Sequence, residues 1–156
     1  MEVYRLCDKE EIDEIFKNKD FKNAGSKGKK YKKKEGEINL NTHHYDEDEM
    51  YMHFFPKFNN LFYLNLEKGM YLCLYDIPDD ILSKNVGTGE YGDPFDYRIT
   101  RMVTEYCIKS NEIKIDYLEK VDLLKNDIDY IDFLSGEPLD DFFENVYAKA
   151  QPTKQR

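Results

Sequence analysis

The chain has 156 residues, of which 40% are hydrophobic and 15% aromatic. This content supports a packed core and excludes wholesale disorder, and the length suits one domain. The 23 Lys and Arg against 32 Asp and Glu give a net charge of -9. That charge argues against a general nucleic-acid coat, because phosphate binding requires the opposite sign.

The first residues, the short apolar stretches and the cysteines predict a cytoplasmic protein without a membrane partner. Residues 1–5 contain no apolar region typical of a secretory signal. The longest apolar stretches, 61–66 and 70–75, are too short to span a bilayer. Three widely spaced cysteines without a CxxC motif argue against a disulfide framework and a cysteine zinc site, and they favour a reducing compartment.

The chain opens with the pattern of a strand followed by a helix. Residues 2–6 alternate in polarity, which predicts a short strand. Asp8 and Glu11 have the spacing of a capping box, and apolar residues from Ile12 to Phe16 then form one stripe. We therefore predict a helix over 9–18.

A basic segment and a buried strand come next. Residues 26–36 hold six lysines and one glutamate, which predicts an exposed, mobile loop. This loop is either a solvated segment or a local site for an anionic ligand or nucleic acid. Residues 51–55 read as a buried strand, and Pro56 suits the first turn of a helix that continues to Leu66.

The second half predicts more strands. Residues 70–76 form the strongest strand pattern, residues 78–82 suit a short helical turn, and 104–108 and 117–124 read as strands. We predict a glycine-rich loop over 83–96. Its Gly87-Thr88-Gly89 lacks a dinucleotide-binding context and is either a plain turn or a substrate contact.

The C-terminal part predicts an amphipathic helix over 135–150, with a frayed tail at 151–156. Strands and helices mix without regular βαβ alternation, which favours a single α+β domain over 1–150. We predict no metal site. His43 and His44 are adjacent and would point to opposite faces, and 127–132 lacks the glycine of a calcium loop.

Three short pieces together resemble the ADP-ribosyltransferase family. They are Tyr4-Arg5 on the first strand, the 51–55 strand leading into a helix, and Thr104-Glu105-Tyr106-Cys107-Ile108 on a late strand. The resemblance covers roughly residues 2–124, including the strand and Ile-Pro of 70–82. It implies a split antiparallel or mixed sheet flanked by helices.

The resemblance also implies site residues. Arg5 and its neighbour Tyr4 would bind NAD, Tyr51 and His53 would lie near the family's middle motif, and Glu105 would be catalytic. A carboxylate suits the oxocarbenium-like ribose formed when nicotinamide leaves, and a guanidinium suits phosphate. The chain departs from the family pattern: its Ser-Thr-Ser is absent, and no second Glu stands two residues before Glu105.

The implied function is binding of NAD, with transfer of ADP-ribose to a protein or nucleic-acid acceptor or hydrolysis of NAD. A catalytically inactive relative is the variant of this interpretation. The enzyme requires Arg5 and Glu105 to line one cleft. The structural alternatives are a surface ion pair for Arg5, a solvent-facing strand position for Glu105, a hydrogen-bonded histidine for His53 and a core position for Tyr51.

A second function follows from charge alone. An acidic interaction or inhibitor protein would use its negative side chains to bind a partner's basic surface. Clustering of Asp and Glu on one face, with Arg5 and Glu105 far apart, would favour this alternative.

Overall fold

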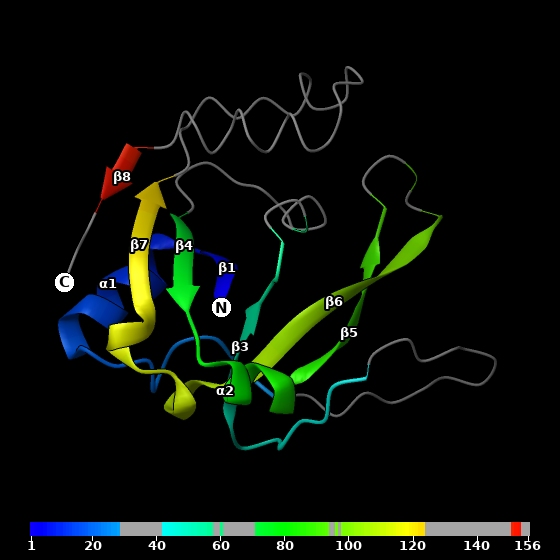
Figure 1. Ribbon diagram of the computed structural model, residues 1–156, viewed down its shortest axis with the longest axis horizontal. Coiled ribbons are helices and arrows are strands. Elements are labelled where there is room, and N and C mark those ends of the chain that lie inside the picture. The colour runs from blue at the N-terminus through cyan, green and yellow to red at the C-terminus, as the bar shows by residue number, and fades with distance from the viewer. Residues whose placement is uncertain are drawn as a thin grey trace.

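The computed structural model of the protein describes residues 1–28, 42–57, 60, 71–93, 96, 98–123 and 151–153. It is an α+β domain with two antiparallel sheets and two short α-helices among these residues (Figure 1). Sheet A has the order β1 (Glu2–Cys7), β4 (Tyr71–Asp76), β7 (Leu118–Leu123) and β8 (Gln151–Thr153). Sheet B has the order β2 (Ser26–Lys27), β3 (Met50–Phe54), β6 (Thr100–Lys109) and β5 (Val86–Gly92).

The two sheets are joined at the start of the chain. Tyr4 on β1 forms a bridge with Phe55 at the end of β3, through reciprocal backbone hydrogen bonds of 2.8 Å. The long β5–β6 hairpin of sheet B extends away from sheet A (Figure 1). The far end of this hairpin is therefore formed by strands of sheet B alone.

The first helix, α1 (Lys9–Asn18), has the predicted bounds and the predicted cap. The Asp8 side chain accepts a hydrogen bond of 2.8 Å from the Glu11 backbone N–H, which satisfies one of the open donors of the first turn. Ile12 and Ile15 are buried, as the apolar stripe requires. The Glu11 side chain does not complete the capping box and binds Arg5 instead.

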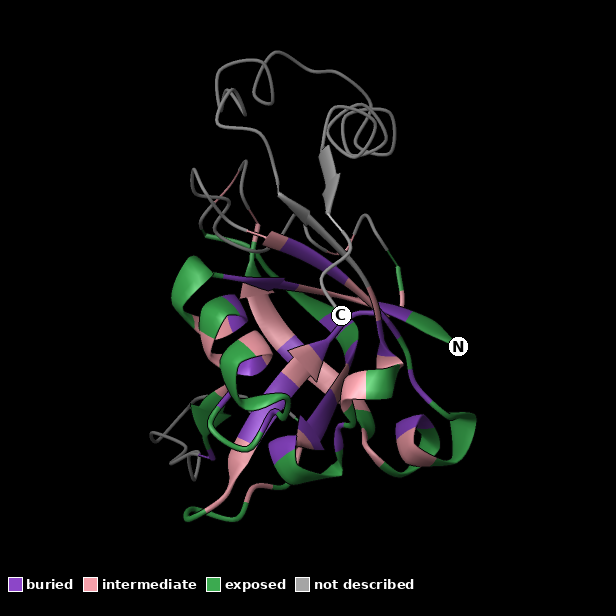
Figure 2. Cartoon of the chain, turned by 90° about the vertical axis from the view of Figure 1, so that its left-hand side faces the viewer, coloured by how far each residue is buried: buried purple, intermediate pink, exposed green. Residues whose placement is uncertain are grey.

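The hydrophobic core takes one side chain in two from the strands, because neighbouring residues of a strand point to opposite faces. Buried residues gather on the strands and on the inner sides of the helices (Figure 2). The largest fully buried side chains include Phe21, Phe54 and Tyr75, and the ring of Tyr75 contacts both phenylalanine rings. On β3 the core-facing residues are Met52 and Phe54, so Tyr51 and His53 point to the opposite face of sheet B.

The strands at 2–6, 51–55, 70–76, 104–108 and 117–124 are confirmed to within a few residues, and the short helix at 78–82 is α2 (Asp79–Lys84). Three predictions are wrong in part. Residues 86–92 of the predicted glycine-rich loop form β5, because Gly87 and Gly89 pair with β6. Residues 26–27 of the predicted basic loop form β2, and 151–153 of the predicted frayed tail form β8 against β7.

The helix predicted to run from Pro56 to Leu66, the lysines at 29–34 and the helix predicted over 135–150 lie outside the described residues. No helix in the described parts of the chain has the length and apolar character needed to cross a bilayer.

Candidate functional site

A polar cluster lies on the face of sheet B opposite the core. Strand alternation puts His53 of β3 on the same face as Glu105 and Cys107 of β6, and His53 pairs directly with Cys107 in the β3–β6 register. Glu105 is 2% exposed and lies on this face rather than in solvent. The structural alternative of a solvent-facing Glu105 is therefore wrong.

Two glycines of β5 make room for the cluster. Gly87 pairs with Glu105, and Gly89, two residues on, points to the same face. A Cβ on Gly87 would lie 2.7 Å from the His43 ring, and one on Gly89 would overlap a Glu105 carboxylate oxygen. The two glycines thus form a side-chain-free floor on which His43 and the Glu105 carboxylate rest.

Glu105 contacts three side chains through its two oxygens. His43 Nε2 lies 3.2 Å from Oε1, and His53 Nδ1 lies 3.5 Å from Oε2. The Tyr91 hydroxyl donates a hydrogen bond of 2.5 Å to Oε2. The side chains of Glu105 and His43 are 3% and 4% exposed, while His53 is 29% exposed and forms the more open edge of the cluster.

These contacts keep the buried carboxylate ionised. Burial by itself raises the pKa of Glu105, but His43, His53 and Tyr91 together outweigh it and lower the pKa to about 2. Burial and the neighbouring Glu105 charge raise the pKa of Tyr91 above its ordinary value, so Tyr91 remains a hydrogen-bond donor at neutral pH. The site therefore presents one fixed negative charge in contact with the Tyr91 hydroxyl and two imidazole rings.

Two imidazole nitrogens of the cluster face the carboxylate. His43 Nε2 and His53 Nδ1 are buried, and their contacts with Glu105 at 3.2 and 3.5 Å are close charge contacts rather than well-aligned hydrogen bonds. Within the described parts of the chain, no group of three His, Cys, Asp or Glu side chains has the arrangement of a metal site.

Arg5 is engaged elsewhere. Its Nε and Nη2 donate to the two carboxylate oxygens of Glu11 at 3.1 and 2.6 Å, and both side chains are 12% exposed. Glu11 also accepts the Gly25 backbone N–H at 3.0 Å. The remaining contact of Arg5 runs from Nη1 to the backbone oxygen of His53 at 3.2 Å. The alternative of an ion pair thus describes Arg5, although the pair is largely buried.

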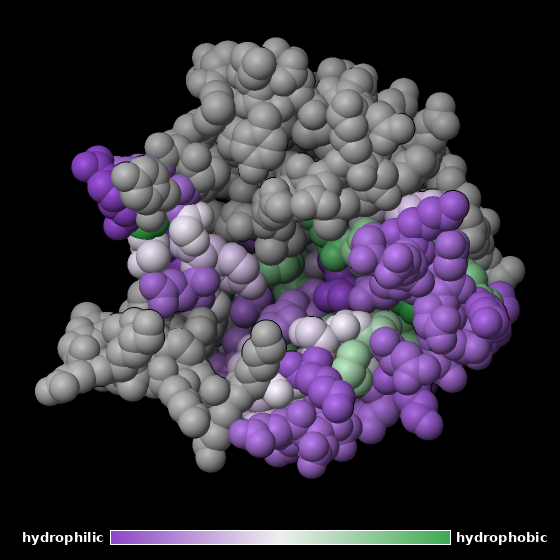
Figure 3. Space-filling model, turned by 180° about the vertical axis from the view of Figure 1, so that it is seen from behind, coloured by the Kyte–Doolittle hydropathy of each residue, from purple (hydrophilic) through white to green (hydrophobic). Residues whose placement is uncertain are grey.

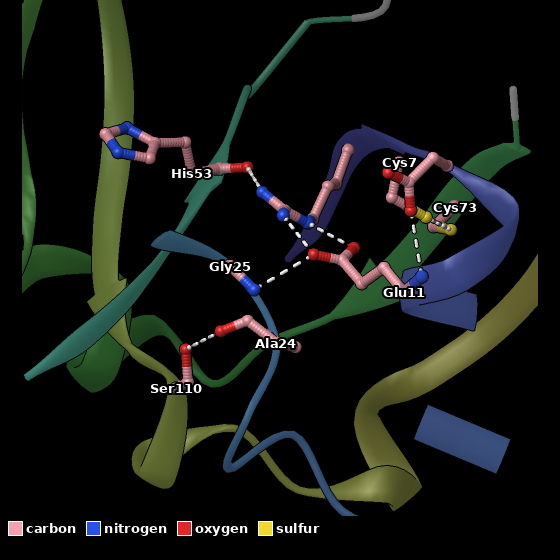
Figure 4. A network of polar contacts seen from close by, with 9 residues as sticks. Cys7, Glu11, Ala24, Gly25, His53, Cys73 and Ser110 are labelled. Atoms are coloured by element: carbon pink, nitrogen blue, oxygen red, sulfur yellow. Dashed lines mark hydrogen bonds and ion pairs between the residues drawn. The ribbon is translucent and has the colours of Figure 1, made fainter. Parts of the chain in front are cut away.

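Arg5 and Glu105 contact different parts of His53 on β3: Arg5 contacts the backbone oxygen, and Glu105 contacts the ring. The His53 ring points away from its own carbonyl oxygen (Figure 4). That oxygen accepts the hydrogen bond from Arg5 Nη1. A cavity of about 790 Å³ is lined by Arg5, Glu11 and Gly25, among others, and Glu105 does not line it. The described residues therefore do not place the two groups in the one cleft that we expected, and Arg5 instead holds the strand that carries His53.

The other candidate residues from the sequence lie either next to the polar cluster or at the junction of the two sheets. Tyr51 lies next to the cluster: its hydroxyl accepts the Asp46 N–H at 2.9 Å, and its ring packs edge-on against Tyr45. Tyr4 contributes its backbone to the sheet junction with Phe55. His53 and Glu105 are brought together, while Arg5 and Tyr4 belong to the junction.

Sequence reasoning missed several members of the cluster. His43 was considered only as a metal ligand beside His44, and Tyr45, Tyr91 and Cys107 were given no role. The available signal was the Gly-x-Gly spacing of 87–89, which on a strand removes two side chains from the same face. Recognising it required knowing that β5 pairs with β6.

The glycine floor leads to a prediction that uses a control within β5. Replacing Gly89 with alanine should destabilise the protein by about 1–3 kcal/mol, because the new Cβ overlaps the buried Glu105 carboxylate. Gly92, at the end of the same strand, has no atom within 4 Å of an added Cβ, so Gly92→Ala should change stability by less than about 0.5 kcal/mol. Urea unfolding of both variants measures the difference, and equal effects would contradict the tight floor.

Most of the described surface on the face seen from behind is hydrophilic (Figure 3).

Comparisons of the chain with protein-family models, with curated proteins and with solved structures found no match.

Proposed function

We propose that the protein is an enzyme of the ADP-ribosyltransferase type, which cleaves the bond between nicotinamide and ribose in NAD. The ADP-ribosyl group would pass to a protein or nucleic-acid acceptor or to water. One observation carries the proposal: Glu105 is a buried, ionised carboxylate enclosed by His43, His53 and Tyr91.

The chemistry of the bond requires such a group. When nicotinamide leaves, positive charge develops on the ribose, and a fixed carboxylate nearby stabilises that charge more strongly in a buried site than in water. The low pKa of Glu105 keeps the carboxylate charged at neutral pH. The partly exposed His53 marks the edge from which the substrate would approach.

Arg5 and Glu105 do not line one cleft among the described residues, so the proposal departs from the family resemblance and rests on the Glu105 cluster without Arg5 as a ligand for NAD. All three guanidinium nitrogens already have partners in Glu11 and the His53 carbonyl. Arg5 therefore acts as a positioning residue that fixes β3 and, through it, the His53 ring. Binding of the NAD phosphates falls to other groups.

Release of nicotinamide from NAD, followed by liquid chromatography, tests the proposal. Glu105→Gln should lower the rate by at least about 100-fold, the usual loss when a charge-stabilising group is removed. Tyr91→Phe keeps the ring but removes the hydrogen bond, and should give a smaller loss. Glu112→Gln, at an exposed position, is the matched control and should retain the wild-type rate. Thermal unfolding of each variant separates lost chemistry from lost folding.

Two results would overturn the proposed enzymatic activity. One is a wild-type protein that releases no nicotinamide and shows no heat of NAD binding in calorimetry. The other is a folded Glu105→Gln variant with the full rate.

An acidic surface next to the cluster supports the second candidate function, a non-enzymatic binder of a basic partner. Asp46, Glu47 and Asp48 are exposed, and residues 45–49 line a cavity of about 490 Å³. Asp46 already pairs with the Lys109 ammonium at 2.9 Å. A protein that ignores NAD but binds a cationic peptide at low salt would fit this candidate.

A further inference from the structure

Cys107 lies at one end of a row of three chemically complementary groups. Its Sγ is 3.8 Å from His53 Nε2, within the range of a hydrogen bond to sulfur. The other ring nitrogen of His53, Nδ1, lies 3.5 Å from Glu105 Oε2. A thiol, an imidazole and a carboxylate are thus connected through the two opposite nitrogens of one ring.

This order is the one that nucleophilic catalysis requires. The imidazole takes the proton of the nucleophile at one nitrogen, while the carboxylate holds the ring and stabilises its protonated form from the other. The β-sheet sets the spacing: His53 and Cys107 are directly opposite on β3 and β6, and Glu105 is two residues from Cys107 on the same face. Three rigid strand positions, rather than a loop, therefore hold the row.

The surroundings of the thiol act on its protonation in opposite directions. Burial raises the pKa of Cys107 to about 12, so the thiol keeps its proton at neutral pH unless a base removes it. A hydrogen bond with the Tyr45 side chain opposes this effect and favours the thiolate. The Tyr45 and His53 rings lie 6.3 Å apart, and both are partly exposed.

The other two cysteines provide the contrast. Cys7 and Cys73 are buried with their sulfur atoms 3.5 Å apart, so Cys7 faces a second thiol and the Glu11 carboxylate, where Cys107 faces an imidazole. Cys7 and Cys107 have the same exposure of 5%. Any difference in their reactivity therefore reports the chemical neighbours rather than access.

We propose that Cys107 is a nucleophile that attacks an electrophilic carbon, with His53 as its base and Glu105 orienting His53. This inference rests on the proposed function, in which the electrophilic carbon is C1′ of the NAD ribose. The Sγ–C1′ bond forms as the bond from C1′ to nicotinamide breaks. Nicotinamide leaves with the electron pair as a neutral base, and the thiol proton moves to His53 Nε2. The product carries ADP-ribose on Cys107.

Alkylation by iodoacetamide tests the nucleophile without NAD. Peptide mass spectrometry of the native protein should show Cys107 reacting at least ~10-fold faster than Cys7, because Cys107 has an imidazole at its proton, whereas Cys7 lies against a second thiol and the Glu11 carboxylate, which is already bound by Arg5. In His53→Gln this advantage should fall to roughly twofold or less, whereas Glu112→Gln should keep it. Labelling in denaturant, where all three thiols are equally accessible, gives the reference rates. A Cys107 that reacts no faster than Cys7, or is unaffected by His53→Gln in a folded variant, would overturn the proposal.

Incubation with NAD forms the second arm. ADP-ribose found on Cys107, and absent from Cys107→Ser, supports the complete step. Nicotinamide release at the wild-type rate by Cys107→Ser, without any adduct on the wild type, would overturn the thiol's part in it and leave the proposed function standing. Fast alkylation of Cys107, together with neither nicotinamide release nor an adduct, would overturn both C1′ as the target and the proposed function. The thiol would then be a nucleophile for another electrophile.

Discussion

Replacing Arg5 with alanine is expected to lower the free energy of unfolding by about 3–5 kcal/mol, the cost of leaving a buried charge without its partner. The charge left behind is Glu11, whose side chain is 12% exposed. Burial alone raises the pKa of Glu11, but the Arg5 charge and its hydrogen bonds outweigh this and hold the pKa below its usual value. Without Arg5, Glu11 must either remain charged in a poorly solvated site or take up a proton. Urea unfolding at neutral pH measures the loss.

Arg98 provides the matched control for Arg5. It also forms an ion pair, with Asp96 at 2.9 Å, but its side chain is 76% exposed. Exposed pairs contribute little, so Arg98→Ala should change stability by no more than about 0.5 kcal/mol. If the two alanine variants lost the same stability, the Arg5–Glu11 pair would not be the stabilising buried ion pair that the structure indicates.

The second large effect is expected at acidic pH, where Glu105 takes up a proton. Its pKa is about 2 in the folded protein against an ordinary value of 4.5. Because the folded pKa is the lower one, the stabilisation is fully present above about pH 4.5 and is lost as the pH falls toward about 2. The shift corresponds to about 3 kcal/mol.

Urea unfolding across pH 2–7 checks this effect as a difference between variants. Other acidic groups also titrate in this window, so the wild type is compared with Glu105→Gln and with the exposed Glu112→Gln. The stability of Glu105→Gln should depend less on pH between about 4.5 and 2, while Glu112→Gln should follow the wild type. Parallel curves for wild type and Glu105→Gln would mean that the carboxylate is not held ionised by its neighbours.

The two predictions concern two buried charges that meet at β3. Arg5 contacts the backbone of His53, and Glu105 contacts its ring. A stable Arg5 contact keeps the strand in place, and the ring can then lie between Cys107 and Glu105. The junction of the sheets and the candidate site are therefore parts of one arrangement around His53.

Local patterns were sufficient for most of the elements. The Asp8 cap and the stripe at Ile12 and Ile15 identified α1, since both signals lie within one or two helical turns. Alternating or continuous apolar runs identified β1, β3, β4, β6 and β7 in the same way. The resemblance to the ADP-ribosyltransferase family also singled out His53 and Glu105 as candidates, and the structure places them in contact.

The partners of each polar group were decided only by the tertiary structure. The pairing of β3 with β6 and of β6 with β5 brings His53, Glu105 and Tyr91 together from distant parts of the chain, and segment 42–45 adds His43. The same folding gives Arg5 to Glu11 on the following helix, so a guanidinium that looked free in the sequence is already bound. The physical reason is that a strand's own sequence specifies which faces are apolar, whereas strand order and register specify which polar side chains meet, and those depend on contacts across the whole chain.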